Sequence, residues 1–464
     1  MAFSFFKIET PPGGKRHSRI SSALVFLLCF IPCMGAVLFG AVDGITWGMI
    51  TILTAVICIL WAAEGCFNEA LPFNGDALQL GLVALILVGL VQLLPLGPAL
   101  PADLLPSAGR QPLSLDPYTT RNFIRNLVVF LIFLSSCLTF INSEIRIRKV
   151  GLVIIIFGAL MAFYGILQHI ADADAIYGIR KAVEANPFGP FVNQHHFAGF
   201  MEMTAGLTLG MIFGSSAKER KFLFGLAAVV MLAAIILTGS RGGLLSICGT
   251  AGFAGLLSFV YRARSGNKAS EETGSKKPVA MGGLILALSV ILLVLFLGGD
   301  ESLTRGLGLT TVGDDPSNGR LHFWSVALQI FLDHPIIGAG LDAFGVAFTR
   351  YDTWNGFYRI EQAHNDYLQM LADGGILGLT CVFGFIFLLF KKSLRTISTA
   401  AVGMRRDIAI GSLAGCFGIL LHSFVDFPLR TWSNSFFFLL LVACATVTVR
   451  AGEEVKTRRK RRTT

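Results

Sequence analysis

The amino-acid sequence predicts an all-α protein that crosses a membrane about twelve times. The 464 residues are 54% hydrophobic and 14% charged, with a mean hydropathy of +0.68, whereas soluble domains carry roughly 25% charged residues. Apolar runs of about 20 residues, the length that spans a bilayer, recur along the whole chain and leave mostly short polar connections. The low charge is therefore not that of a soluble domain with a single anchor.

The predicted spans follow the apolar runs, and the first of them is too long to be a signal peptide. They are 20–40, 45–62, 77–97, 124–141, 150–170, 196–214, 222–239, 243–261, 279–298, 367–390, 407–425 and 432–449. This divides the chain into spans one to nine with short loops (1–298), a large loop (299–366), spans ten to twelve (367–449) and a basic tail (450–464).

The distribution of basic residues predicts the orientation. Of the 38 Lys and Arg, 27 fall on the side that holds both termini, and the positive-inside rule assigns that side to the cytoplasm. Ten of the 11 basic residues on the other side are arginines, which bind phosphate and carboxylate through a planar fork. Lower use of lysine in exported loops would explain the same bias. Seven of the eight histidines also lie on the outer side.

Composition argues against several other classes of protein. The basic run at 458–462 has no basic or aromatic-rich soluble domain beside it, so we expect no nucleic-acid partner. Nearly all of the nine cysteines sit in apolar runs and show neither a disulfide framework nor zinc-like spacing. A D-A-D run at 172–174 and the pair at 314–315 are weak candidates for a divalent cation, which needs further oxygen ligands. We therefore predict no metal and no cofactor.

The loop at 299–366 is too long for a passive connector. Residues 317–333 have helical periodicity, and Ser317 or Asn318 could cap the helix. Leu321, Trp324, Leu328 and Phe331 fall on one face of this helix. We expect an amphipathic helix on the membrane surface or against the bundle, followed by the glycine-rich turn H-P-I-I-G-A-G-L-D-A-F.

Two residues on the outer side are candidates for chemistry. His364, in A-H-N-D-Y-L-Q-M-L-A-D-G-G, comes just before the tenth span, at the boundary between membrane and water; an interfacial histidine without a catalytic role is the alternative. Arg241 lies in the short turn T-G-S-R-G-G between two spans, where glycines let the backbone approach a ligand. A charge at membrane depth suggests function, although snorkelling to the headgroups would also place it there.

Several motifs in order resemble one family. They are S-L-D-P-Y, G-P-F-V-N-Q-H-H-F-A-G-F, T-G-S-R-G-G, G-R-L-H-F-W, D-H-P-I-I-G-A-G-L-D-A-F, H-N-D-Y-L-Q-M-L-A-D-G-G and H-S-F-V-D-F-P-L at 422–429. Together with the topology, they make the chain similar to the Wzy_C / O-antigen ligase superfamily. Its members are O-antigen ligases, Wzy-type polymerases and protein O-oligosaccharyltransferases.

The resemblance implies a metal-independent glycosyltransferase of the bacterial inner membrane with a periplasmic active site. Its partners would be a glycan donor on undecaprenyl diphosphate, a glycan or lipid A–core acceptor, and membrane lipid. His364 matches the family's essential loop histidine, and Arg241 matches the arginine in the turn before span eight. Further candidates for binding the substrate are Arg320, Arg359, His322, His422, Asn193 and His196.

The implied reaction needs a general base and positively charged groups that stabilise the leaving diphosphate. Neutral His364 would take the proton of the acceptor hydroxyl, and Arg241, helped by Arg320 or Arg359, would stabilise the leaving diphosphate. Direct attack would invert the anomeric carbon. The alternatives are a polymerase of the same superfamily, a transporter or flippase of lipid-linked sugars, for which no inverted repeat is evident, and a scaffold of a cell-envelope complex.

Overall fold

The structure is a computed structural model that describes residues 7–9, 18–97, 110–173, 175–182, 185–214, 218–266, 319–354, 356 and 360–449. Its helices are α1 (Arg19–Val37), α2 (Gly44–Phe67), α3 (Gln79–Gln92), α4 (Pro117–Phe140), α5 (Glu144–Ile170), α6 (Gln194–Phe213), α7 (Lys218–Leu237), α8 (Arg241–Gly266), α10 (Arg320–Asp333), α11 (Phe344–Tyr351), α12 (Asp366–Thr399), α13 (Met404–His422) and α14 (Trp432–Thr446). Short 3-10 turns lie at η1 (Phe39–Ala41) and η2 (Pro428–Arg430), and the short strands β1 (Lys7–Glu9) and β2 (Ala70–Pro72) pair in parallel.

The all-α membrane fold predicted from the sequence is confirmed. A helix lies at eleven of the twelve predicted spans, and the ninth, 279–298, falls outside the described residues. Seven of the described helices are long and apolar enough to cross a membrane, and α3 and α14 are shorter apolar helices. The number of twelve spans and the division into loops remain predictions.

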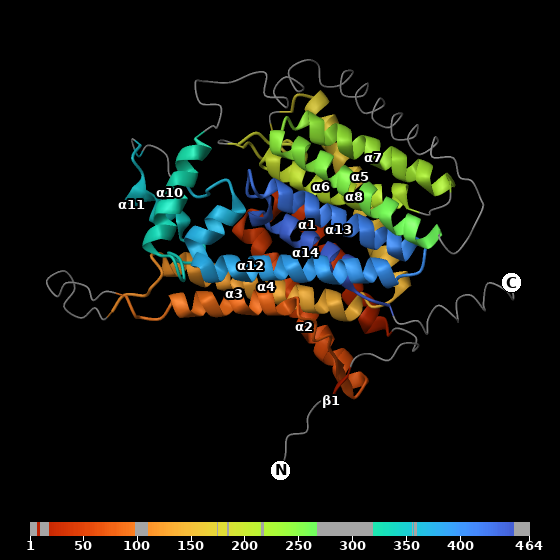
Figure 1. The fold of residues 1–464 in the computed structure, drawn as a ribbon, viewed down its shortest axis with the longest axis horizontal. Coiled ribbons are helices and arrows are strands. Elements are labelled where there is room, and N and C mark those ends of the chain that lie inside the picture. The colour runs from red at the N-terminus through yellow and green to blue at the C-terminus, as the bar shows by residue number, and fades with distance from the viewer. Residues whose placement is uncertain are drawn as a thin grey trace, which may run out of the picture.

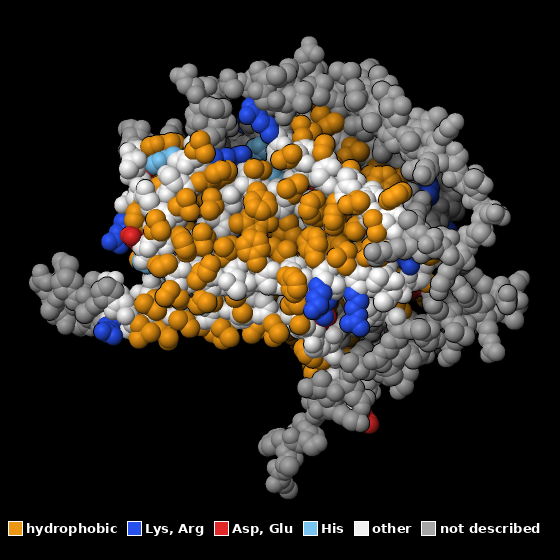
Figure 2. Space-filling view, viewed as in Figure 1, with side chains coloured by type: hydrophobic (Ala, Val, Ile, Leu, Met, Phe, Trp, Pro, Cys, Tyr) orange, Lys and Arg blue, Asp and Glu red, His pale blue; other side chains and the backbone are white. Residues whose placement is uncertain are grey.

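Most of the long helices run side by side as one bundle, from which α2 projects, and the shorter α10 and α11 lie at one end of it (Figure 1). Figure 2 shows a broad band of hydrophobic side chains across the outward face of this bundle. Large apolar residues of the bundle helices stay exposed, for example Ile45 at 77%, Leu80 at 62% and Phe387 at 63%. Such a surface suits lipid, in which an apolar side chain has no reason to turn inward.

Helix α6 is the centre of the bundle, buried over most of its length, and packs closely against α13. Gly206 and Gly210 of α6 face Gly411 and Gly415 of α13, and a Cβ on Gly210 would come within 2.3 Å of the Gly411 backbone. Small residues four apart let two membrane helices approach in this way. Their close contact brings the start of α6 near the end of α13, where the candidate site lies.

Helix α10 forms where the sequence predicted it, and the apolar stripe of Leu321, Trp324, Leu328 and Phe331 is not its most deeply buried face. The buried residues are Phe323, Val326, Ala327 and Ile330, whereas Leu321 is 66% and Leu328 is 45% exposed. The smaller Val326 and Ala327 face the protein, where α10 packs against α11 and α12. In a membrane protein, an apolar repeat does not distinguish the side facing protein from the side facing lipid. The helix is capped at Gly319, with no side-chain capping bond, rather than at Ser317 or Asn318.

Helix α12 is broken near its start, and the loop after α10 fills the break. Gly375 has a left-handed φ of +60°, and the amides of Ile376 and Leu377 donate to the carbonyls of Pro335 and Ile336 instead of to their own helix. A Cβ on Gly375 would clash with the Ile336 backbone at 2.5 Å. The glycine-rich turn and the A-D-G-G motif thus form one unit, which holds the first turns of α12 and His364 before them.

Candidate active site

His364 lies in the turn that precedes α12, with its side chain 31% exposed. Its φ is +51°, a left-handed conformation that costs energy for a residue with a side chain. Asn365 caps the helix, because its side-chain oxygen accepts from the amides of Tyr367 and Leu368 at 3.0 Å. The cap and the strained turn hold the imidazole at the end of the helix, facing the loop after α13.

Asp426, in that loop, is the partner of His364. The two side chains meet at 3.2 Å, between Nδ1 of His364 and Oδ1 of Asp426. Arg320 donates from Nη2 to the other carboxylate oxygen at 3.3 Å, and the Phe427 amide donates to Oδ1 at 2.9 Å. Asp426 itself is 2% exposed. One buried carboxylate therefore holds His364 and Arg320 together.

Two effects act on the pKa of Asp426. Burial by itself would raise it, but the hydrogen bond from His364 and the charges of His195, His364 and His422 outweigh burial and lower the pKa well below its usual range. The group is thus a carboxylate at neutral pH. Because a carboxylate only accepts hydrogen bonds, neutral His364 carries its proton on Nδ1 to make this contact. Its Nε2 then has a lone pair that can accept a proton.

Backbone contacts lock the two loops together. The Asp366 amide donates to the Ser423 carbonyl at 2.9 Å, and the Asn365 side chain donates to the Phe424 carbonyl at 2.8 Å. Phe427 packs edge-on against the rings of both His364 and His196, at centroid distances of 4.7 and 4.8 Å. The distance from His364 to Asp426 is therefore set by several contacts rather than by one.

The turn between α7 and α8, which carries Arg241, lies against the same group of histidines. Ser240 meets His195 Nδ1 at 2.9 Å and accepts from the Gly243 amide at 3.1 Å. A Cβ on Gly242 would lie 2.7 Å from Nε2 of His422. Arg241 is the first residue of α8 and is exposed. Gly242 allows this close approach to the end of α13, and Gly243 allows a similar approach to Ala198 of α6.

His422 and Glu202 form a buried pair beneath this turn. His422 Nδ1 lies 2.9 Å from Glu202 Oε1, and the two side chains are 1% and 0% exposed. Their helices are the closely packed α13 and α6. The pair lies in the membrane-spanning part of the bundle. Ionisable residues are costly there, and they usually have a functional or structural role.

The structure brings together four of the residues that the sequence singled out for the site. These are His364, Arg320, His196 and His422, which surround Asp426 or its neighbour Phe427. Asn193 instead caps α6, with its side-chain oxygen accepting from the His195 amide at 2.8 Å. His322 points to a separate cluster with Asp352 and Trp354. Arg359 lies outside the described residues.

Sequence reasoning missed Asp426 and Arg430. Both belong to H-S-F-V-D-F-P-L-R, the break between α13 and α14. Two opposite charges in a short, proline-containing break between apolar helices could have been taken as a signal. Without the fold, nothing paired Asp426 with a residue 62 positions earlier.

Arg430 is surrounded by three carboxylates. It contacts Asp342 through Nη1, Asp373 through Nη2 at 2.9 Å and Asp366 through Nε at 3.8 Å. Burial alone would lower the pKa of Arg430, but these carboxylates raise it above its usual value. Ser423 donates to Asp366 at 2.8 Å. Arg430 thereby ties η2, the start of α12 and the loop before α11 into one unit.

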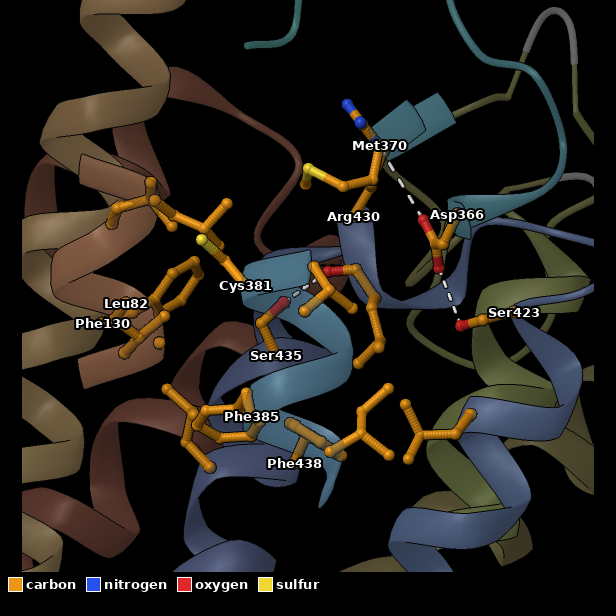
Figure 3. Close-up of a pocket in the computed structure, with 18 of the residues that line it drawn as sticks. Leu82, Phe130, Asp366, Met370, Cys381, Phe385, Ser423, Arg430, Ser435 and Phe438 are labelled. Atoms are coloured by element: carbon orange, nitrogen blue, oxygen red, sulfur yellow. Dashed lines mark hydrogen bonds and ion pairs between the residues drawn. The ribbon is translucent and has the colours of Figure 1, made fainter. Parts of the chain in front are cut away.

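An apolar cavity of about 200 Å³ lies beside this unit, between α3, α4, α12 and α14 (Figure 3). Its walls are formed by side chains such as Leu82, Phe130, Phe385 and Phe438. Its polar end is formed by Asp366, Ser423 and Arg430, and Figure 3 shows Asp366 bonded to both partners. The polar end of the cavity thus lies at the segments that carry His364 and Asp426.

Among the described residues, no three His, Cys, Asp or Glu side chains are arranged to hold a metal ion. Asp174, Asp314 and Asp315, three of the weak candidates from the sequence, lie outside those residues. The absence of a metal and of a cofactor remains a prediction.

Comparison with known proteins finds one family. Residues 226–383 match the family model Wzy_C, described as O-antigen ligase. The matched segment runs from α7 into α12 and includes Arg241, Arg320 and His364, but not Asp426 or Arg430. No curated protein matches the chain.

Proposed function

We propose that this chain, whose residues 226–383 match the Wzy_C, or O-antigen ligase, family model, is a glycosyltransferase of the ligase type. It would move a glycan from undecaprenyl diphosphate to a hydroxyl of lipid A–core or a similar acceptor, at the periplasmic face of the bacterial inner membrane. The observation that carries the proposal is the contact of His364 with buried Asp426.

In the proposed reaction, His364 is the general base. Asp426 orients the ring through Nδ1, as an aspartate orients the histidine of a catalytic triad. Nε2 takes the proton of the acceptor hydroxyl while its oxygen attacks the anomeric carbon. The bond from that carbon to the diphosphate oxygen breaks, and its electron pair leaves with the diphosphate. Attack from the opposite side inverts the anomeric carbon.

The leaving diphosphate needs positive charge and hydrogen-bond donors. Arg320 uses one nitrogen on Asp426 and is 27% exposed, so its other N–H groups can reach a phosphate. Arg241 adds a second guanidinium at the start of α8, where the helix dipole also favours an anion. The apolar cavity, whose polar end adjoins the loop of Asp426, would take the first isoprenoid units of the donor lipid.

The test is transfer by the full chain, purified into lipid nanodiscs, from a lipid-diphosphate glycan to candidate acceptors. We expect His364→Ala to lower kcat by roughly 10²- to 10⁴-fold, the contribution of general acid–base catalysis. His169→Ala is the matched control, because His169 is an exposed histidine at the end of α5. Transfer that persists in His364→Ala at the control rate would refute the assignment, as would a retained anomeric configuration by NMR.

The polymerase and flippase alternatives are separated by the same preparation. A ladder of product lengths identifies a polymerase, and a single addition identifies a ligase. A flippase would move the donor between leaflets, and His364→Ala would then impair delivery of the donor rather than transfer. Activity that survives a strong chelator agrees with the metal-free mechanism, whereas activity lost to a chelator and restored by one cation would contradict it.

A further inference from the structure

His322 and Trp354 form a rigid aromatic pair beside α10. Their rings stack in parallel, with centroids 4.3 Å apart and planes within 10°. Asp352 holds both partners, because its Oδ1 meets His322 Nε2 at 2.9 Å and accepts from the Trp354 amide at 3.0 Å. The pKa of Asp352 is lowered by the hydrogen bonds from the Trp354 amide and from His322. The indole is therefore fixed although it lies in a loop.

The fixed indole is also open. Trp354 is 52% exposed, and His322 covers one of its faces, so the exposure lies on the other face and the edges. Immobilising a side chain costs conformational entropy, and an exposed indole buries too little surface to recover much of it by packing. The stacking on His322 and the amide hydrogen bond to Asp352 suggest that the position of Trp354 matters for what binds to it.

Trp354 stands next to the candidate active site. Phe323 lies between the indole and His364, with ring centroids 5.8 Å from Trp354 and 6.0 Å from His364. A Cβ on Gly319 would come within 2.8 Å of the indole edge, so the indole lies over the first turn of α10, directly before Arg320. A molecule bound at Arg320 and His364 would extend from them across this surface.

We propose that the open face of Trp354 binds a sugar ring of the glycan substrate by stacking. A pyranose presents a face of C–H groups with small positive partial charges, and the face of an indole carries the negative part of its quadrupole. The inference rests on the proposed function, and it adds a subsite one or a few sugars away from the bond that is made. Trp354 would set the affinity for the glycan and not the rate of the chemical step.

A lipid-interface anchor is the competing role for an exposed tryptophan. The surroundings of Trp354 favour the sugar. The indole rests on the hydrogen-bonded polar pair His322 and Asp352, and its edge lies over Gly319, next to the arginine that contacts Asp426. An anchor would be expected among apolar side chains that face the bilayer.

The first experiment measures KM and kcat in nanodiscs for Trp354→Ala and Trp354→Tyr. Loss of one aromatic contact should raise KM roughly tenfold in Trp354→Ala, with kcat unchanged, and the tyrosine should recover most of the loss. A rise confined to the donor or to the acceptor tells which glycan lies there. Tyr118→Ala, which removes a 71% exposed aromatic residue at the start of α4, is the control.

The second experiment does not depend on catalysis. The probe is the water-soluble glycan released from the donor lipid by mild acid, and saturation-transfer NMR reports its binding to the full chain. A weaker saturation-transfer signal from the glycan with Trp354→Ala than with Tyr118→Ala supports the subsite. Equal signals with the two variants overturn it. Quenching of Trp354 fluorescence by brominated lipid, measured against Trp354→Phe, would identify a lipid anchor and overturn it too.

The two proposals can fail separately. If His364→Ala is inactive while Trp354→Ala keeps the KM of the native chain, the sugar subsite is wrong and the proposed function stands. If His364→Ala transfers at the native rate, the proposed function is wrong, and the NMR measurement still decides whether Trp354 binds a sugar.

Discussion

Two clusters of arginine and aspartate are centred on Asp426 and Arg430, which are four residues apart in the chain. The two clusters are built in opposite ways. Around Asp426, one carboxylate holds His364 and Arg320, whose side chains are 31% and 27% exposed. Around Arg430, which is 12% exposed, three carboxylates surround one guanidinium. The two side chains that Asp426 holds are partly exposed, whereas the charges of the second cluster are directed at one another.

This difference separates the candidate site from the residues that support it. A guanidinium has five donors, and those of Arg430 are directed at groups of the protein that hold α12, η2 and the loop before α11. Arg320 gives one contact to Asp426 and keeps the rest of its capacity for a ligand. Buried charge is therefore not by itself a mark of the active site, since the more heavily charged cluster here is the one less able to bind a phosphate.

Asp426→Asn should have the largest effect on activity. The amide can donate to Nδ1 of His364, which then carries its proton on Nε2 and loses its basic lone pair on the substrate side. We expect kcat to fall by roughly 10²- to 10⁴-fold, with the fold retained because the shape of the side chain is kept. Asp333→Asn, at a carboxylate that accepts from Tyr351, is the control. Equal kcat for the two variants would contradict the role of Asp426.

Replacing each arginine by methionine compares the two clusters directly. Arg430→Met leaves three carboxylates near one another without a counter-charge, and breaking a buried pair of this kind costs about 3–5 kcal/mol. Arg320→Met breaks one partly exposed contact, which costs about 0–1 kcal/mol, but should raise KM for the donor. Thermal unfolding in detergent and transfer kinetics measure both. The comparison fails if Arg320→Met proves the less stable variant.

Asn193→Ala tests a residue that the sequence proposed for the site and the structure finds at a helix cap. Loss of the cap should lower stability by about 1 kcal/mol, seen as a lower unfolding temperature, with KM unchanged. A raised KM at an unchanged unfolding temperature would instead return Asn193 to the binding site.

Asp426 and Asp342 should make small contributions of opposite sign to the change of folding stability with pH. The lowered pKa of Asp426 stabilises the folded state above its ordinary pKa, and this stabilisation is lost as the pH falls. Burial raises the pKa of Asp342, although Arg430 opposes the rise, so acid removes a penalty there. Between pH 6 and pH 3, Asp426→Asn should therefore lose less stability than the native chain, and Asp342→Asn more. The same change of stability with pH in the native chain and in both variants would contradict these pKa shifts.

Much of the fold follows from local pattern. Apolar runs of membrane length predicted eleven segments at which a helix is described, since a helix satisfies its own backbone within the run. The start of α12 was also predictable, because Asn365 is a capping residue. The packed face of α10 was not, because Leu321 and Leu328 are as apolar as Phe323 and Ile330, and only the neighbouring helices decide which face they cover.

The sequence by itself determined the class of the molecule, the candidate residues His364, Arg320 and Arg241, and the resemblance of the segment that carries them to one family. These depend on composition and on residues close together in the chain. Only the tertiary structure decided that Asp426 meets His364, that Arg430 is enclosed by Asp342, Asp366 and Asp373, and that Asn193 caps a helix. The reason is physical: whether a charge supports the fold or faces a substrate depends on its partners, and most of those partners lie tens of residues away.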